Sequence, residues 1–268
     1  MKHSRILVLL SGLLAGAVLL PESVVADHSW NGYHWPRTST QVLLDVGSVV
    51  SEEWQPYLEE AIDDWNASRV IELTEVASGT NPRNCKAVKG RIEVCNSAYG
   101  NNGWLGIAQI WASGLHITQA TTRVNDTYFT QPFYNTPAWR RLVMCQEIAH
   151  DFGLDHQDEA FDNPNMGTCM DYTDDPEGPP SNEHPNGHDY DQLELIYEHS
   201  DGGGGGGGGG RGRGAASRDI FPTPADQRMD FETPYQWGRQ LRSNGRVALF
   251  DADLGNGNHV FTFVIWAR

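Results

Sequence analysis

One short stretch in the middle of the chain constrains its fold and chemistry more than any other. It carries Gln146 and Glu147, then His150, Gly153 and finally His156. In a helix, residues four apart lie on one face, so Gln146 and His150 point the same way and Glu147 lies beside them. Glycine commonly ends a helix, and Gly153 lets the chain turn and bring His156 back toward the same point. The spacing predicts a helix whose end gathers two imidazoles, an amide and a carboxylate.

This set of side chains is typical of a metal centre. A catalytic zinc ion is held by three protein ligands and keeps one position open for water. His150 and His156 are strong zinc ligands, whereas the amide of Gln146 is a poorer ligand than an imidazole. We expect a zinc site of these three residues, with Glu147 holding a water molecule and taking its proton as general base. A solvated helix face with scattered His and Glu is the alternative, and the continuation of the pattern to His156 argues against it.

Residues 1–26 are predicted to be a secretory signal peptide. Lys2 and Arg5 precede an apolar run from Ile6 to Leu20, and Val24-Val25-Ala26 is a small-residue cleavage pattern. The unbroken apolar run is shorter than the roughly 18 to 20 residues that a membrane-spanning helix needs. We therefore expect a secreted, extracellular protein without a membrane anchor.

Charge limits the partners of the exported chain. The formal net charge of the full sequence is −16 at pH 7, and such acidity disfavours nucleic acid and anionic membranes. We expect neither as a partner, and we favour a monomer, although no sequence feature determines the oligomeric state.

A glycine run divides the chain. Gly202–Gly210 is unbroken glycine, which predicts a flexible linker over residues 201–219. The linker separates a main domain of residues 41–200 from a small C-terminal β segment of residues 220–268. Residues 27–40 form an N-terminal segment that precedes the main domain. About fifty residues make a small hydrophobic core, so the C-terminal segment could dock on the main domain instead of folding alone.

The four cysteines predict disulfide bonds. An even number of cysteines in an exported chain favours disulfides, and the absence of any C-x-x-C spacing argues against a cysteine zinc site. Four cysteines allow three pairings. We favour Cys85 with Cys95 and Cys145 with Cys169, because each pair closes a short local loop.

Apolar periodicity predicts a mixed α and β domain. Three helices are expected, with four strands between the first two helices, one strand before the first helix and two strands near the C-terminus. Two alternating apolar runs around Gly255-Asn256-Gly257-Asn258 predict a C-terminal β-hairpin. The expected helices are Glu52–Ala67, Pro137–Gly153 and Asp189–Glu198; the expected strands are Gln41–Val46, Val70–Val76, Arg91–Cys95, Ile107–Trp111, His116–Asn125, Val247–Leu254 and His259–Trp266.

The stretch from Gln41 to His199 resembles the metzincin clan of zinc endopeptidases, and within it a matrixin-type domain. The resemblance rests on the order of the elements and on a Q-E-x-x-H-x-x-G-x-x-H variant of the clan's H-E-x-x-H-x-x-G-x-x-H motif. It implies an α+β fold with a twisted, mostly parallel sheet, two long helices, a Met-turn and a C-terminal helix, to which the β-hairpin segment is added. By position, Met170 is similar to the Met-turn methionine, and Tyr172 to a tyrosine that stabilises the oxyanion.

The resemblance also implies a function. It predicts a secreted zinc metalloendopeptidase that acts on a protein or peptide substrate. The strand Ile107–Trp111, or the strand after it, is similar to the edge strand on which these proteases bind an extended peptide. The alternative is a non-catalytic protein that keeps the protease fold and binds a peptide or an inhibitor, because Gln146 replaces the first zinc-binding histidine.

Residues 151–201 offer further candidate ligands. They contain fifteen acidic side chains and no Lys or Arg. Asp171, Asp174, Asp175 and Glu177 are close enough in sequence to bind calcium, and a solvated acidic face is the alternative that we favour. His184 and His188 lie in the loop before the last helix. Either could supply a missing imidazole to the metal, but we favour surface positions for both.

Overall fold

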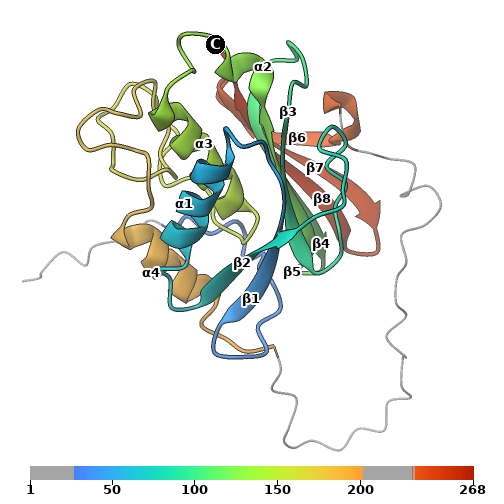
Figure 1. The fold of residues 1–268 in the computed structure, drawn as a ribbon. Coiled ribbons are helices and arrows are strands. Elements are labelled where there is room, and N and C mark those ends of the chain that lie inside the picture. The colour runs from blue at the N-terminus through green and yellow to red at the C-terminus, as the bar shows by residue number, and fades with distance from the viewer. Residues whose placement is uncertain (1–26, 202–230, 232) are drawn as a thin grey trace, which may run out of the picture.

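The computed structural model describes residues 27–201, 231 and 233–268 (Figure 1). The predicted signal peptide at residues 1–26 and the glycine run of the predicted linker lie outside the described residues, and both stay predictions. None of the helices in the described part is long and apolar enough to cross a membrane.

One eight-stranded sheet runs through the described chain in the order β2-β1-β3-β5-β4-β8-β7-β6. Helices α1 and α3 cover one face of its first half, and α4 lies at the end of α1 (Figure 1). The elements are β1 (Val42–Val49), α1 (Gln55–Trp65), β2 (Ile71–Ala77), β3 (Arg91–Ser97), β4 (Trp104–Ser113), β5 (His116–Asn125), α2 (Asp126–Phe129), α3 (Pro137–His150), α4 (Gly187–Ile196), a 3₁₀ turn (Pro234–Gln236), β6 (Arg239–Ser243), β7 (Val247–Gly255) and β8 (Asn258–Trp266).

The sheet is mixed, which confirms the α+β class but corrects one detail. β1 pairs in parallel with β2 and β3, and β3 pairs in parallel with β5. All pairs from β5 onward, β5–β4, β4–β8, β8–β7 and β7–β6, are antiparallel. A mostly parallel sheet is therefore wrong for the whole molecule. Tight turns connect β4 with β5 and β7 with β8, and such turns permit only antiparallel neighbours.

The C-terminal segment contributes three strands to this sheet. The hairpin turn between β7 and β8 places Asn256 and Gly257 at φ 55° and 75°, as a two-residue turn of this kind requires. β6 was not predicted, because its sequence RQLRS has no apolar alternation and its residues are mostly exposed at the sheet edge. The segment does not form a separate sheet, since β8 pairs with β4 of the main domain.

A capping residue and a proline set the start of helix α3, and packing against other elements buries most of the helix. The hydroxyl of Thr136 accepts a hydrogen bond from the Trp139 amide, and Pro137 occupies the first helical position. Twelve of its residues, from Ala138 to His150 except Arg141, are buried. α1 packs beside it and β4 and β5 lie beneath it. The polar residues near its end are therefore in the interior.

Hydrophobic clusters occupy both faces of the sheet around β8. Phe261 and Phe263 belong to the main core beneath the helices, whereas Val260 and Val264 pack on the opposite face with Trp237. This alternation is the period-2 pattern of a strand that is buried on both sides. The side chains that β8 contributes to the main core therefore include two aromatic rings, those of Phe261 and Phe263.

Both favoured disulfides are confirmed. Cys85 is bonded to Cys95, and Cys145 is bonded to Cys169. The second bond joins the residue before Gln146 to the residue before Met170.

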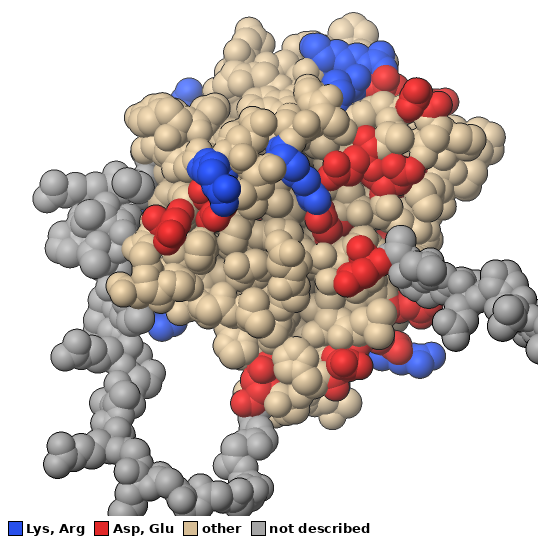
Figure 2. All heavy atoms as spheres, turned by 180° about the vertical axis from the view of Figure 1, so that it is seen from behind, with Lys and Arg blue, Asp and Glu red and all other residues tan. Residues whose placement is uncertain are grey.

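Acidic and basic side chains are interspersed on the face of the molecule that Figure 2 shows. Most of the basic side chains on this face lie next to acidic ones, and they form no continuous basic area (Figure 2). The prediction that nucleic acid is not a partner remains untested.

Candidate metal centre

The two predicted histidine ligands meet at the end of α3. The Nε2 atoms of His150 and His156 lie 2.9 Å apart, and the rings cross at 80°. His150 is 1% exposed and the side chain of His156 is 5% exposed. The loop that Gly153 starts therefore returns His156 to the helix, as its sequence position predicts.

Neighbouring groups orient both imidazoles. The Nδ1 atom of His150 lies 2.8 Å from the Leu154 carbonyl, to which it donates a hydrogen bond, so the lone pair of Nε2 faces His156. Nδ1 of His156 lies 3.3 Å from Asp155 and 3.5 Å from Glu159. Burial and the neighbouring His156 lower the pKa of His150 well below its usual value. His150 is therefore a neutral imidazole with a lone pair available for a cation.

Gly153 is required at its position by two independent constraints. Its φ is +102°, which L side chains rarely adopt, and an added Cβ would lie 2.2 Å from the carbonyl oxygen of Tyr33. The N-terminal segment passes directly over the turn. The Trp30 amide donates to the Gly153 carbonyl at 3.0 Å, and the Asp155 amide donates to the His28 carbonyl at 2.7 Å.

Glu147 and Gln146 are buried polar groups that the described chain leaves without partners. Both are 0% exposed, and neither carboxylate oxygen nor either amide atom has a hydrogen-bond partner among the described residues. Burial, and then the charge of Asp151, raise the pKa of Glu147 well above its usual value, although the nearby Ala108 amide opposes the shift. Buried polar groups are rarely left unpaired, so this pair fits a site that holds a further group.

Strand β4 forms one wall of the centre. A Cβ atom on Gly106 would lie 2.7 Å from Glu147 Oε1 and 2.7 Å from Val143 Cγ1. The backbone of β4 therefore approaches the carboxylate as closely as a glycine permits.

Tyr172 and Met170 reach the same region from the loop after α3. The Tyr172 hydroxyl contacts the imidazole of His156, and its ring stacks on Phe161 with centroids 5.1 Å apart. Met170 is completely buried, and its carbonyl accepts a hydrogen bond from the Gln157 amide at 2.6 Å. The structure thus brings Tyr172 to the imidazole pair and ties Met170 to the residue after His156. The roles implied for the two residues stay predictions.

The C-terminal segment closes the centre, a contact that was not predicted. The ring of Phe263 on β8 stacks on His150 with centroids 4.1 Å apart and planes at 10°. Arg242 on β6 pairs with Asp155, and its Nε lies 3.2 Å from Glu159 Oε1. The alternating aromatic residues of β8 predict a buried strand face, but they do not indicate that this face contacts His150.

Arg242 affects the carboxylate that lies beside His156. Burial alone would raise the pKa of Asp155, but hydrogen bonds and charge attraction from His156 and Arg242 outweigh it and hold the pKa well below its usual range. Asp155 is therefore ionised and contacts both Arg242 and the imidazole of His156.

The expectation of a free edge strand for an extended peptide is wrong for this structure. β4 pairs with β5 on one side and with β8 on the other, and β5 lies between β3 and β4. Ala108 of β4 is opposite Phe263 of β8. The chain's own C-terminal strand occupies the hydrogen-bonding edge that a substrate would need.

Calcium binding, the less favoured interpretation of the acidic residues, has no support among the described residues. Asp174 pairs with Arg246 and Arg268 of the C-terminal segment. A carboxylate oxygen of Asp171 accepts from the Met166 amide at 2.8 Å. Among the described residues, the groups of His, Cys, Asp and Glu close enough to share an ion are His34, His199 and Asp201, and separately Asp155, His156 and Glu159.

The two loop histidines are engaged elsewhere. Nδ1 of His184 lies 2.8 Å from Asp64 of α1, and the ring of His188 stacks on His28 with centroids 4.7 Å apart. The side chain of His184 is 43% exposed. These contacts favour the surface interpretation for His184 and a packing role for His188.

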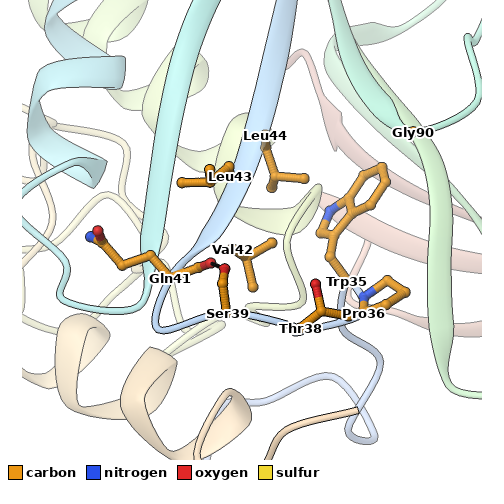
Figure 3. Close-up of a pocket in the computed structure, with 9 residues that line it drawn as sticks. All are labelled: Trp35, Pro36, Thr38, Ser39, Gln41, Val42, Leu43, Leu44 and Gly90. Atoms are coloured by element: carbon orange, nitrogen blue, oxygen red, sulfur yellow. Dashed lines mark hydrogen bonds between the residues drawn. The ribbon is translucent and has the colours of Figure 1, made fainter. Parts of the chain in front are cut away.

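A separate hollow of about 380 Å³ lies at the start of β1 (Figure 3). Apolar side chains and backbone dominate its lining, and it contains no titratable side chain. It offers no catalytic chemistry. Its lining residues are Trp35, Pro36, Thr38, Ser39, Gln41, Val42, Leu43, Leu44 and Gly90.

The chain matches no protein-family model and no curated protein sequence. Among solved structures it is similar to high choriolytic enzyme 1, a hatching enzyme zinc-protease from Oryzias latipes (Medaka fish). The TM-score is 0.36 at 11% identity, over 63% of this chain and 96% of that one. It is also similar to myroilysin, with a TM-score of 0.36 at 12% identity, over 64% of this chain and 98% of that one. Similarity at this level identifies neither a family nor an activity.

Proposed function

We propose that this protein is a zinc-dependent endopeptidase. The observation that carries the proposal is the pair of facing Nε2 atoms of His150 and His156, 2.9 Å apart, in a buried site that also contains the unpaired carboxylate of Glu147. A zinc ion lies about 2.0 to 2.1 Å from each imidazole nitrogen that binds it, and two nitrogens 2.9 Å apart can both meet that distance. Gln146 would supply its amide oxygen as a weak third ligand.

The residues around the pair suit peptide hydrolysis. Zinc in such sites polarises a carbonyl group and lowers the pKa of water. Glu147 would accept a proton at its carboxylate, and its raised pKa makes it a stronger base than an exposed glutamate. The Tyr172 hydroxyl, beside His156, would donate a hydrogen bond to the oxyanion that develops on the substrate. Asp155 and Glu159 would keep His156 in its binding orientation.

The state described here would be a closed one. A substrate has to reach residues that are almost completely buried, and the edge of β4 is paired with β8. Release of β8 would expose that edge, whose backbone amides and carbonyls could then pair with an extended peptide. It would also remove Phe263 from His150. We therefore propose that the C-terminal segment must leave β4 before the enzyme acts.

The direct test measures metal content and proteolysis. The purified protein is assayed on a casein-type substrate with added zinc, beside the variant Glu147→Ala at equal concentration. Activity that depends on zinc and is at least about 100-fold lower in the variant supports the proposal, because general-base catalysis contributes roughly 10²- to 10⁴-fold. Equal activity in both proteins would refute it.

A second candidate function is a non-catalytic protein that keeps this site without a reaction. The amide at position 146 and the occupied edge of β4 favour it. The variant Gln146→His discriminates between the two functions, since it restores a third imidazole. If this variant binds zinc and cleaves casein while the native protein does neither, the native protein is non-catalytic. If both bind zinc and cleave, the amide is a working ligand.

A further inference from the structure

A second group of metal-binding side chains lies apart from the candidate metal centre. It consists of His34 from the N-terminal segment and His199 and Asp201 from the residues that follow α4. His116, at the start of β5, borders it. These residues come from three distant parts of the sequence, and no motif connects them.

The donor groups of these three residues lie close enough together to share one ion. Nε2 of His34 lies 3.0 Å from Nε2 of His199 and 3.6 Å from a carboxylate oxygen of Asp201, while Nε2 of His199 lies 3.4 Å from the other oxygen. Ligands about 2.0 to 2.1 Å from a tetrahedral zinc ion are separated by about 3.3 Å. The three separations lie around this value.

Neighbouring groups orient the donors toward a common point. Nδ1 of His34 donates to the Gly32 carbonyl at 2.7 Å, which leaves the lone pair of its Nε2 facing His199. The Asp201 carboxylate accepts from the Arg37 amide at 2.7 Å. His34 is 4% exposed, and the side chains of Asp201 and His199 are 16% and 48% exposed, so the site is buried at His34 and open at His199. The buried ligand, His34, is held in its binding orientation, and the exposed ligand, His199, leaves the site open to an ion from solution.

We propose that His34, His199 and Asp201 bind a zinc ion that has a structural role. Two imidazoles and a carboxylate are ligands that zinc accepts and that calcium and magnesium do not prefer. Nε2 of His116 lies 3.2 Å from Asp201 Oδ1, where the imidazole can hold the carboxylate or become a fourth ligand. The ion would join the N-terminal segment to the end of the main domain. This inference does not depend on the proposed peptidase activity.

Zinc stoichiometry and thermal stability test the site in the full exported chain. The variants are His199→Ala and Asp201→Asn, and the matched control is His184→Ala. The side chains of His199 and His184 are 48% and 43% exposed and each contacts an aspartate, so both alanine variants should fold. The variant His156→Ala separates this site from the candidate metal centre. Zinc bound per chain and the zinc-induced rise in Tm are measured for each protein.

We expect His199→Ala and Asp201→Asn each to bind one zinc fewer than the native chain and to lose the zinc-induced rise in Tm that this site produces. Their affinity at this site should fall by about 100-fold or more, and the control should match the native protein. His156→Ala should retain this zinc even if the peptidase proposal fails. Native zinc content and an unchanged rise in Tm in His199→Ala and Asp201→Asn would overturn the proposal and leave a cluster held by hydrogen bonds alone.

Discussion

Phe263 is the residue through which the C-terminal segment covers the candidate metal centre, and its removal is the sharpest test of the closed state. Its side chain is 1% exposed, lies flat on His150 and meets the edge of the Trp30 ring at a centroid distance of 5.1 Å. Phe263→Ala removes these contacts and leaves the backbone pairing of β8 with Ala108 of β4 in place. The variant should therefore loosen the cover without altering a ligand.

The structure sets the size of the effect. Truncation of a buried phenylalanine to alanine costs about 3 to 5 kcal/mol. The ion pairs of Arg242 are partly exposed and contribute at most about 1 kcal/mol each, so the loss of Phe263 outweighs the contribution of either ion pair. If about 3 kcal/mol of the loss falls on docking of β8, the open fraction rises by roughly 100-fold. Peptidase activity should rise by a similar factor until the open state predominates.

The assay compares zinc-dependent casein hydrolysis by the native protein, Phe263→Ala and the control Phe129→Ala. Phe129 is 2% exposed, and its ring contacts Trp54 and the guanidinium of Arg140, both of which belong to the main domain, so its loss should lower stability without loosening β8. We expect activation in the first variant alone. If Phe263→Ala loses stability like the control but shows no rise in activity, the cover does not limit access and the reasoning is refuted.

Three further predictions concern the framework of the site. Gly153→Ala should lower the free energy of unfolding by more than about 1 to 3 kcal/mol, because residue 153 has a φ of +102° and an added Cβ would lie 2.2 Å from the Tyr33 carbonyl oxygen. Denaturant titration measures this loss, and a native free energy of unfolding would contradict the turn geometry. The double substitution Cys145→Ala and Cys169→Ala should lower the free energy of unfolding by about 3.5 kcal/mol, because the disulfide closes a loop with a sequence separation of 24 and restricts the unfolded chain. An unchanged Tm would show that the bond does not constrain the chain. Burial raises the pKa of Tyr190 from 10.0 to about 12, so ionisation favours the unfolded chain and stability falls as pH rises through this window. Tyr190→Phe should show a shallower alkaline loss, and an equal loss would contradict the shift.

Local sequence was enough to predict most of the elements that build the candidate site. The cap at Thr136 and Pro137 sets the start of α3, and the turn at Gly153 returns His156 to His150. These predictions succeed because capping, helical periodicity and glycine φ depend on neighbours within a few residues. The same holds for the disulfide loops and the β7–β8 hairpin. The polar edge strand β6 was missed, since an exposed strand requires no apolar pattern.

The sequence by itself determined which side chains could bind a metal, and the tertiary structure decided which of them meet and whether they are accessible. The pairing of β8 with β4 joins segments far apart in the chain, and its free energy depends on packing on both sheet faces, which no local pattern encodes. The same is true of the cluster of His34, His199 and Asp201. Burial is likewise a property of the assembled fold. It leaves Glu147 unpaired and raises its pKa only because β4 and its neighbours exclude water from it.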